Sequence, residues 1–260
     1  MNAKMMNTKH FLATSALVAL LCSLALAPST KAGILTGPLT NTANGHIYYL
    51  LTETNWIAAE QEALALGGHL ATIRNAAEES WIYTNFNYYN NVVRALWIGL
   101  YDTNPLVNST NRATRRTEFA WISGEPVTYT HWSPVEPDNP DSSEGDNPPV
   151  WEFYGHIWDR DDLNAGTWNN YLNLVTIFGY PLNGVVEIVP IPNLTIVEKT
   201  TNQVALSWPA WATNYVLQST SALGGTNWQS VTNLPATNAN QLIVTNPIVG
   251  FARFFRLVQH

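Results

Sequence analysis

A polar stretch between residues 133 and 149 holds the side chains of this sequence that are best suited to chemistry. Glu136 and Asp138 flank Pro137, and the stretch consists of Pro, Asp, Glu, Asn and Ser with almost no apolar residue. Such a segment is a surface loop that cannot pack on its own, so a ligand or an ion would have to order it. Calcium takes about six to eight oxygen ligands and suits this supply of carboxylates and amides. An ordinary solvated loop has the same composition and is the alternative.

A second acidic cluster precedes Trp168. Its members are Asp159, Asp161, Asp162 and Asn164. Their spacing departs from the helix–loop–helix calcium pattern at the later positions, so we interpret the cluster as a solvated turn and not as a second ion site.

Clustered carboxylates could also belong to a glycosidase, with Glu136, Asp138 and Asp146 as its acids. The acid of a hydrolase needs an apolar surrounding that raises its pKa, whereas this loop is polar and open. The sequence has no Gly-x-Ser-x-Gly motif, no zinc-binding helix and no phosphate-binding loop. We therefore expect a binding protein and not an enzyme.

Tryptophan is abundant, with 11 in the chain, and sugars stack their apolar faces on such rings. Three tryptophans in strand patterns are expected to be core residues, namely Trp97, Trp121 and Trp132. Three others lie nearer the polar loop and are candidate stacking residues, namely Trp151, Trp158 and Trp168.

Two helices are predicted between the first strand and the later loops. A strand at residues 46–51 follows the Asn44-Gly45 turn. Apolar residues at helical spacing predict a helix over residues 56–66, capped by Thr54 or Asn55 and stopped by Gly67-Gly68. A second helix begins at Asn75, which pairs with Glu78 in a capping motif.

From Leu96 onward the helical period disappears, and short extended segments alternate with polar loops. The expected strands are residues 97–100, 118–122, 128–132, 168–170 and 185–189. Residues 190–193 form a stiff Pro-Ile-Pro-Asn connector. Beyond it, strands at near-regular spacing predict an all-β sandwich, at residues 194–197, 204–208, 215–218, 228–231, 242–244 and 254–258.

Together these elements resemble the C-type lectin-like domain family. The motifs that carry the resemblance are Asn44-Gly45-His46-Ile47-Tyr48-Tyr49, Gly67-Gly68-His69-Leu70-Ala71-Thr72-Ile73, Trp97-Ile98-Gly99-Leu100, Trp121-Ile122-Ser123-Gly124-Glu125-Pro126, Glu136-Pro137-Asp138 and Trp168-Asn169-Asn170. They follow the family's order and approximate spacing from about Gly45 to Val189. The chain lacks the paired cysteines of animal members and is closer in style to disulfide-free bacterial members.

The resemblance implies an α+β fold, with two helices packed on short antiparallel strands and a long ligand loop, followed here by the small sandwich. It also implies a cis peptide bond before Pro137, which turns the side chains of Glu136 and Asp138 to the same side of the loop.

The implied function is calcium-dependent carbohydrate binding. The implied metal ligands are Glu136, Asp138, Asp146, Asn169 and Asn170, with Glu144 as an alternative to Asp146. The implied sugar contacts are Glu136, Asp138, Asn169 and Trp168. About two coordination positions would remain for sugar hydroxyls. The rival interpretation is a lectin-like domain that binds protein or serves adhesion without sugar or calcium.

Two departures from the family pattern affect the expected sugar preference. Sugar-binding members have Glu-Pro-Asn or Gln-Pro-Asp where this chain has Glu-Pro-Asp, and an aspartate where it has Asn170. Three carboxylates remain in either case, but Glu136 and Asp138 are both acceptors when ionised. The hybrid motif therefore does not distinguish mannose-type from galactose-type binding.

The ends of the chain are expected to be an export signal and a separate module. Residues 1–32 read as a signal peptide, because Lys4 and Lys9 precede an apolar run over residues 11–27. Residues 44–189 are the expected C-type lectin-like domain, and residues 192–260 resemble a fibronectin type III or immunoglobulin-like module.

Charge and cysteine content limit the partners. Cys22 is the only cysteine and lies inside the expected signal, so the mature chain has no disulfide. The formal charge is −7, and loss of Lys4, Lys9 and Lys31 with the signal makes it −10. This negative charge disfavours nucleic acid as a partner. The sequence has no second long apolar run, so we expect no transmembrane segment in the mature chain. We expect a secreted or cell-surface protein whose partner is a carbohydrate, a glycoconjugate or a protein surface.

Overall fold

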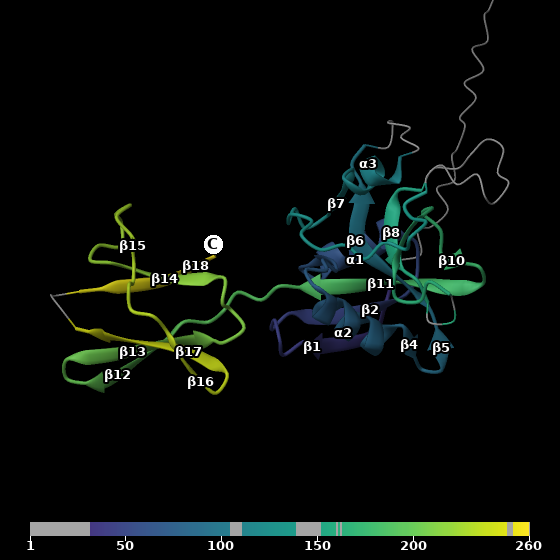
Figure 1. Cartoon of the computed structure of the whole chain (residues 1–260). Coiled ribbons are helices and arrows are strands. Elements are labelled where there is room, and N and C mark those ends of the chain that lie inside the picture. Colours follow the sequence, from purple (N-terminus) through teal and green to yellow (C-terminus); the bar gives the residue numbers. More distant parts are fainter. Residues whose placement is uncertain are drawn as a thin grey trace, which may run out of the picture.

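The computed structural model describes residues 32–104, 111–138, 152–159, 161, 163–248 and 252–259. Within these ranges the chain forms an α+β part that ends at Ile188 and then a small all-β sandwich, joined by a single connection between β11 and β12 (Figure 1). This confirms the expected fold class. No helix in these ranges has the length and apolar character needed to cross a membrane.

The two predicted helices are present. The first, α1 (Trp56–Ala65), begins at Asn55, whose side chain accepts a hydrogen bond from the backbone N–H of Ala58 at 2.9 Å. The second, α2 (Ala76–Phe86), begins at Asn75, which accepts from the N–H of Glu78. A short third helix, α3 (Arg112–Arg116), has no apolar period and is not predicted from the sequence.

A nine-stranded sheet forms the centre of the α+β part. Its strands are β1 (Ile34–Thr40), β2 (Ile47–Glu53), β3 (His69–Leu70), β6 (Ala95–Asp102), β7 (Phe119–Trp121), β8 (Tyr154–Ile157), β9 (Trp168–Tyr171), β10 (Thr176–Ile177) and β11 (Tyr180–Ile188). Strands β4 (Tyr88–Tyr89) and β5 (Val92–Val93) form a separate hairpin. Strand β1, strand β8 and the two-residue strands β3, β4, β5 and β10 were not predicted from the sequence. The strand expected over residues 128–132 is only a single bridge from Trp132 to Trp168.

Strand β11 joins the beginning and end of this part. It lies between β2, with which it pairs antiparallel, and β6, with which it pairs parallel over Leu182–Gly184 and Ala95–Trp97. The residues of β11 that enter these pairings are almost all buried. Trp97, Trp121 and Trp132 are buried in the same part, which confirms their predicted core role.

The sandwich has a four-stranded and a three-stranded sheet. Its strands are β12 (Thr195–Thr200), β13 (Gln203–Pro209), β14 (Tyr215–Thr220), β15 (Gln229–Ser230), β16 (Ala236–Asn238), β17 (Gln241–Pro247) and β18 (Phe254–Gln259). The sandwich buries a core of its own around Leu206, Trp208 and Val244. Six of these strands are predicted from the sequence, and β16 is the exception.

The two parts touch at a turn before β2. Trp211 of the sandwich lies edge-on to His46, with ring centroids 6.5 Å apart and the planes at 82°. Gly45 approaches the same ring so closely that a Cβ atom there would lie 2.5 Å from Cγ of Trp211. Only glycine fits this position, which also has a φ of +74°.

Candidate functional site

The loop that carries Glu136 is fixed against strand β9. The backbone N–H of Ser133 donates to the carbonyl of Trp168 at 2.9 Å, and the N–H of Trp168 donates to the carbonyl of His131 at 2.7 Å. The N–H of Glu136 then donates to the carbonyl of Ser133, which makes a tight turn. The peptide bond between Glu136 and Pro137 is cis, as the family resemblance implies.

Arg116 holds this turn from helix α3. Its guanidinium donates to the backbone carbonyl of Glu136 through Nε at 3.0 Å and through Nη2 at 2.6 Å, and it also reaches the carbonyl of Ser133. A planar guanidinium that donates twice to one acceptor fixes orientation as well as distance. These hydrogen bonds engage the backbone of Glu136 and not its carboxyl group.

The carboxyl group of Glu136 is in an environment that disfavours a lone negative charge. Glu136 is only 7 % exposed, and its Oε2 atom is buried without a hydrogen-bond partner among the described residues. Burial and the neighbouring Asp138 carboxylate raise the pKa of Glu136 to about 8. A cation would relieve both the desolvation and the repulsion.

Strand β9 supplies two further oxygens of the same kind. The side-chain Oδ1 atoms of Asn169 and Asn170 are buried and meet no hydrogen-bond donor in the described part of the chain. Buried oxygens are almost always paired, so three of them on Glu136, Asn169 and Asn170 need an explanation. A hard cation that takes oxygen ligands provides one, and these residue types fit calcium.

Glu152 is a carboxylate that the sequence analysis did not select. It is buried just before β8, and its backbone carbonyl accepts a hydrogen bond from Nδ2 of Asn170 at 3.2 Å. The sequence analysis assigned the third carboxylate to Asp146, with Glu144 as an alternative, and both lie outside the described residues. The signal that could have found Glu152 is its place immediately before the aromatic Phe153-Tyr154 pair that leads into a strand.

Trp168 has a structural role next to this site. Its ring is completely buried, and Nε1 donates to Oε1 of Glu79 on α2 at 2.5 Å. The other oxygen of Glu79 accepts from the hydroxyl of Tyr129 at 2.6 Å and lies 3.0 Å from Nδ1 of His131. The ring of Trp168 is therefore part of the core and offers no face to a sugar. Of the other stacking candidates, Trp158 is also buried, and Trp151 lies outside the described residues.

The second acidic cluster has local partners. The carboxylate of Asp159 accepts from the backbone N–H of Asp161 at 2.9 Å, as in an ordinary turn. Oδ1 of Asn164 lies 3.1 Å from the hydroxyl of Ser133, and this contact joins the turn to the Glu136 loop. Asp162 lies outside the described residues.

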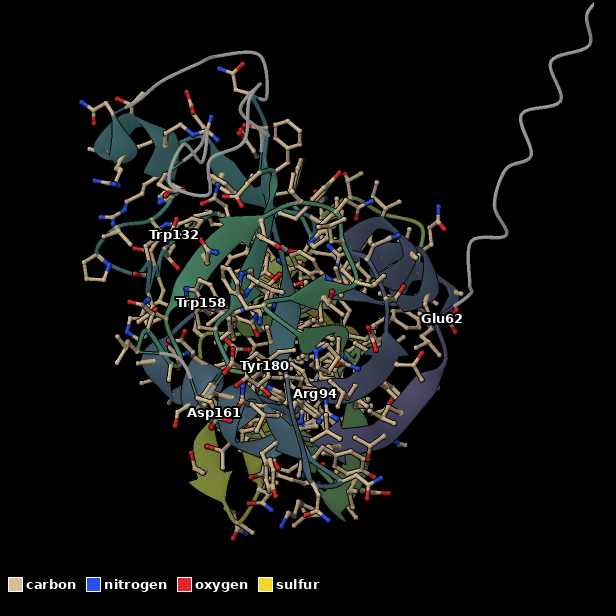
Figure 2. All side chains as sticks on the ribbon, turned by 90° about the vertical axis from the view of Figure 1, so that its right-hand side faces the viewer. Glu62, Arg94, Trp132, Trp158, Asp161 and Tyr180 are labelled. Atoms are coloured by element: carbon tan, nitrogen blue, oxygen red, sulfur yellow. The ribbon has the colours of Figure 1, made fainter. Side chains whose placement is uncertain are left out.

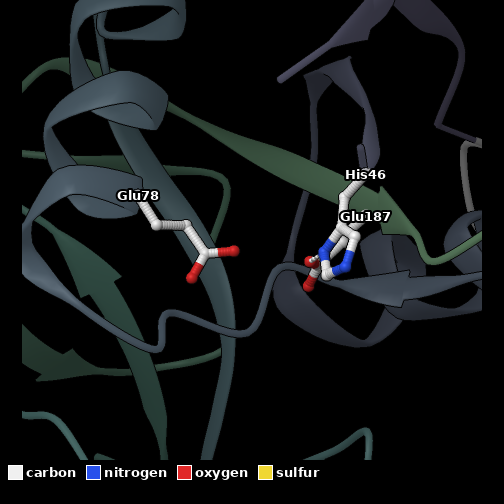
Figure 3. A group of neighbouring side chains, drawn as sticks. All are labelled: His46, Glu78 and Glu187. Atoms are coloured by element: carbon white, nitrogen blue, oxygen red, sulfur yellow. Dashed lines mark hydrogen bonds and ion pairs between the residues drawn. The ribbon is translucent and has the colours of Figure 1, made fainter. Parts of the chain in front are cut away.

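A third group, far from these loops in sequence, has the composition of a metal site. Possible ligand atoms of His46, Glu78 and Glu187 lie within 4.8 Å of one another, and in the described ranges this is the one such group of His, Cys, Asp and Glu. Figure 3 shows Glu78 on α2 pointing toward His46 and Glu187. No local motif marks this group in the sequence, because its three residues come from separate segments.

A guanidinium already supplies the positive charge in this group. Nη1 of Arg74 lies 2.8 Å from Oε1 of Glu78 and 2.7 Å from Oε1 of Glu187, while Nδ1 of His46 lies 2.5 Å from the same Glu187 oxygen. The hydroxyl of Tyr48 donates to both carboxylates. Although burial opposes it, the hydrogen bond from His46 and the charge of Arg74 lower the pKa of Glu187. We interpret the group as a structural ion-pair network that joins α2, β2 and β11.

Comparisons with known proteins point to lectins. No protein-family model matches the chain. Human C-type mannose receptor 2 is 33 % identical over 121 residues, which cover 46 % of this chain and 7 % of the receptor. An alpha-N-acetylgalactosamine-specific lectin from Patiria pectinifera is 32 % identical over 108 residues, which cover 39 % of this chain and 58 % of that lectin. The chain thus spans less than two thirds of the length of these relatives.

A solved structure is similar to part of the chain. It is the cow C-type carbohydrate-recognition domain of CD23 in the presence of a GlcNAc2Man3 oligosaccharide, with 23 % identity and a TM-score of 0.39. The alignment covers 56 % of this chain and 89 % of that domain. In sequence, 46 % of this chain is similar to the mannose receptor and 39 % to the alpha-N-acetylgalactosamine-specific lectin.

Proposed function

We propose that the chain is a carbohydrate-binding protein whose α+β part binds sugar through a calcium ion. The single observation that carries the proposal is the set of buried oxygens on Glu136, Asn169 and Asn170 that meet no hydrogen-bond donor among the described residues. Burying an acceptor without a partner costs about 1–3 kcal/mol. Three such atoms around one loop and one strand are better explained by a cation than by three independent defects.

The proposed ligands are Glu136, Asp138, Asn169 and Asn170, with a further carboxylate from the segment that enters β8. Asp146 is the sequence-based choice for that carboxylate, and the burial of Glu152 beside Asn170 supports Glu152 as well. A bound calcium ion would supply open coordination positions for a pair of sugar hydroxyls. Glu136 and Asp138 are acceptors for sugar hydroxyls, whereas the amide groups of Asn169 and Asn170 can also donate.

The relatives support a saccharide as the ligand class. One is named a lectin specific for alpha-N-acetylgalactosamine and another a mannose receptor, so the names span both broad sugar types. This agrees with the hybrid Glu-Pro-Asp motif, which favours neither type.

A thermal melt with calcium and with chelator tests the ion site. A ligand that binds only the native state raises stability by an amount that grows with its concentration, and at about 100 times Kd the gain is about 2.7 kcal/mol. We expect Tm to rise with calcium and to fall with chelator, and Glu136→Gln to remove the response. Asp161→Asn, in the second acidic cluster, is the matched control and should keep it. A Tm that does not change when calcium is added at millimolar concentration would favour the rival function, a protein-binding domain.

Calorimetry then tests the sugar. With calcium present, titration of monosaccharides should give heats in the wild type that vanish with chelator. Calcium binding without any sugar heat would leave the ion site in place and refute the sugar function.

We also propose export and modular construction. The leader at residues 1–32 would be removed, which makes the protein secreted or cell-surface exposed; residues 44–189 would be the lectin-like domain, and residues 192–260 a separately folding module. The distinct core of the sandwich supports the last point. Residues 192–260 expressed alone should unfold cooperatively, and a disordered product would contradict the boundary.

A further inference from the structure

An exposed phenylalanine occupies the turn between β10 and β11. Phe178 is 65 % exposed and has a φ of +46°, and the following Gly179 has a φ of +86°. The flanking residues Ile177 and Tyr180 pair directly, so the two residues form a tight hairpin loop. Such loops favour Asn-Gly because both central residues need positive φ.

Phenylalanine is doubly costly at this position. A bulky side chain in the left-handed region is strained, and an exposed ring forgoes the benefit of burial. Asparagine would avoid both costs. Strain and exposure that the fold does not require are a reason to look for a function at the residue.

The ring of Phe178 is held in a fixed orientation. It lies nearly parallel to the ring of Trp158, with an interplanar angle of 13° and centroids 6.0 Å apart. Trp158 directly follows β8 and is buried, so it gives Phe178 a packed neighbour. Figure 2 looks onto the face turned away from the sandwich and labels both Trp158 and Tyr180, the residue that follows Gly179 in the hairpin. Phe178 is thus an oriented aromatic platform with much of its surface in solvent.

A short series of contacts joins this platform to the Glu136 loop. The N–H of Trp158 donates to the carbonyl of Thr167, and the N–H of Thr167 donates to the carbonyl of Asn164. The side chain of Asn164 contacts the hydroxyl of Ser133, whose carbonyl accepts from Glu136. A series of hydrogen bonds therefore runs from Trp158, which contacts the platform, to the loop of the proposed calcium site.

We propose that Phe178 is a second saccharide contact, which stacks against a pyranose ring of an oligosaccharide whose other end is bound at the Glu136 site. Pyranose rings present C–H groups on one face, and an oriented aromatic ring binds that face, as ring pairs do, at little entropic cost. This inference rests on the proposed function. It makes the ligand a chain of sugars and not a single residue.

Phe178→Asn removes the ring and suits the turn. The Asn-Gly loop is the preferred one for this hairpin, so the variant should fold and keep or raise the Tm of the wild type. Phe178→Trp keeps an aromatic face. Tyr88→Ala, at an exposed aromatic residue of the separate β4–β5 hairpin, is the matched control.

The test is calorimetry with calcium on the full chain. The probes are mannose, galactose and N-acetylglucosamine, each as the monosaccharide and as a linear tetrasaccharide. The wild type should bind at least one tetrasaccharide about tenfold more tightly than its monosaccharide. Phe178→Asn should lose this preference with monosaccharide affinity unchanged, while Phe178→Trp and Tyr88→Ala should keep it.

The failures can be told apart. A Phe178→Asn variant that keeps the wild-type preference, or a wild type without one, overturns the second contact and leaves the primary site standing. Loss of monosaccharide binding in Phe178→Asn would make the residue part of the primary site and also overturns the inference. If no monosaccharide or tetrasaccharide binds to the wild type with calcium, both the proposed function and the second contact fail.

Discussion

Arg116 donates two hydrogen bonds to the backbone carbonyl of Glu136, from Nε at 3.0 Å and from Nη2 at 2.6 Å. The side chain that positions the proposed ligand therefore comes from a helix about twenty residues earlier, and it acts through the backbone of Glu136.

Arg116→Ala should release this turn. Hydrogen bonds to a charged group contribute about 1.5–3 kcal/mol, so we expect calcium affinity to fall by about tenfold or more. Arg116→Lys should be intermediate, because an ammonium lacks the planar fork. Calorimetric titration with calcium measures the effect. Arg112→Ala removes an exposed positive charge from the same helix, which by itself should leave calcium affinity unchanged or raise it, so an equal fall in that variant would contradict the role given to the hydrogen bonds of Arg116.

Asn170→Asp and Asp138→Asn should change calcium affinity in opposite directions. The first adds a carboxylate at a proposed ligand position, and the second replaces one by an amide, so affinity should rise and fall by roughly tenfold, respectively. Asp138→Asn also adds a donor and should improve any mannose-type contact. Calcium titrations of the three proteins, followed by sugar titrations, check both effects. Identical calcium affinities in all three would remove Asp138 and Asn170 from the ligand set.

Stability should decrease in acid through Glu187. Its pKa is lower in the folded protein than in the unfolded chain, so its contribution is present above the unfolded value of about 4.3 and is lost as pH falls through the folded value. Glu187→Gln should cost about 1.5–3 kcal/mol at pH 7, since it removes the charged acceptor of His46 and one of the carboxylates around Arg74, which keeps Glu78 and Glu125. The deficit should shrink in acid.

Urea unfolding from pH 7 to pH 3 measures this difference. Glu198→Gln, on the exposed strand β12, should behave like the wild type throughout. A Glu187→Gln deficit that stays constant with pH would contradict the assigned pKa direction.

Gly45→Ala should loosen the contact between the two parts of the chain. The new methyl group meets the ring of Trp211 and also suffers a φ of +74°. Gly67→Ala is the matched control, because Gly67 has a φ of +88° but open space around it. Backbone strain should lower the free energy of unfolding of both variants by about 1–2 kcal/mol. The clash with Trp211 should lower that of Gly45→Ala by about 1–3 kcal/mol more.

A double-mutant cycle with Trp211→Ala isolates the cost of the clash between the new methyl group at position 45 and the ring of Trp211. In the Trp211→Ala background, Gly45→Ala should cost no more than Gly67→Ala when urea unfolding is followed. An undiminished cost would mean that Trp211 does not rest on Gly45 in solution.

The sequence predicted those features that depend on neighbouring residues, such as helix caps and the cis peptide bond. Asn55 and Asn75 cap their helices as expected, and Glu136-Pro137 adopts the expected cis bond. The helices, the tryptophan core and most strands of the sandwich follow in the same way from spacing and turn residues.

Tertiary contacts determine the features that the sequence did not show. Arg116 and Glu152 become part of the site only through contacts with Glu136 and Asn170, and neither belongs to a local motif. Trp168 lies in the motif expected to touch sugar, yet its bond to Glu79 makes it a core residue. The missed strand β1 lacks the apolar alternation that would have marked it, since most of its residues are partly or fully exposed.

The position of β11 in the sheet has a consequence for synthesis. This strand lies between β2 and β6 yet is the last of the α+β part to leave the ribosome, so residues 32–171 emerge with a gap at the centre of their sheet. Loop closure between β2 and β11 must join segments more than a hundred residues apart, which makes folding of this part slow and late. If the proposed leader at residues 1–32 directs export, the chain would reach the membrane before β11 completes the sheet, and so in an unfolded form that can be translocated.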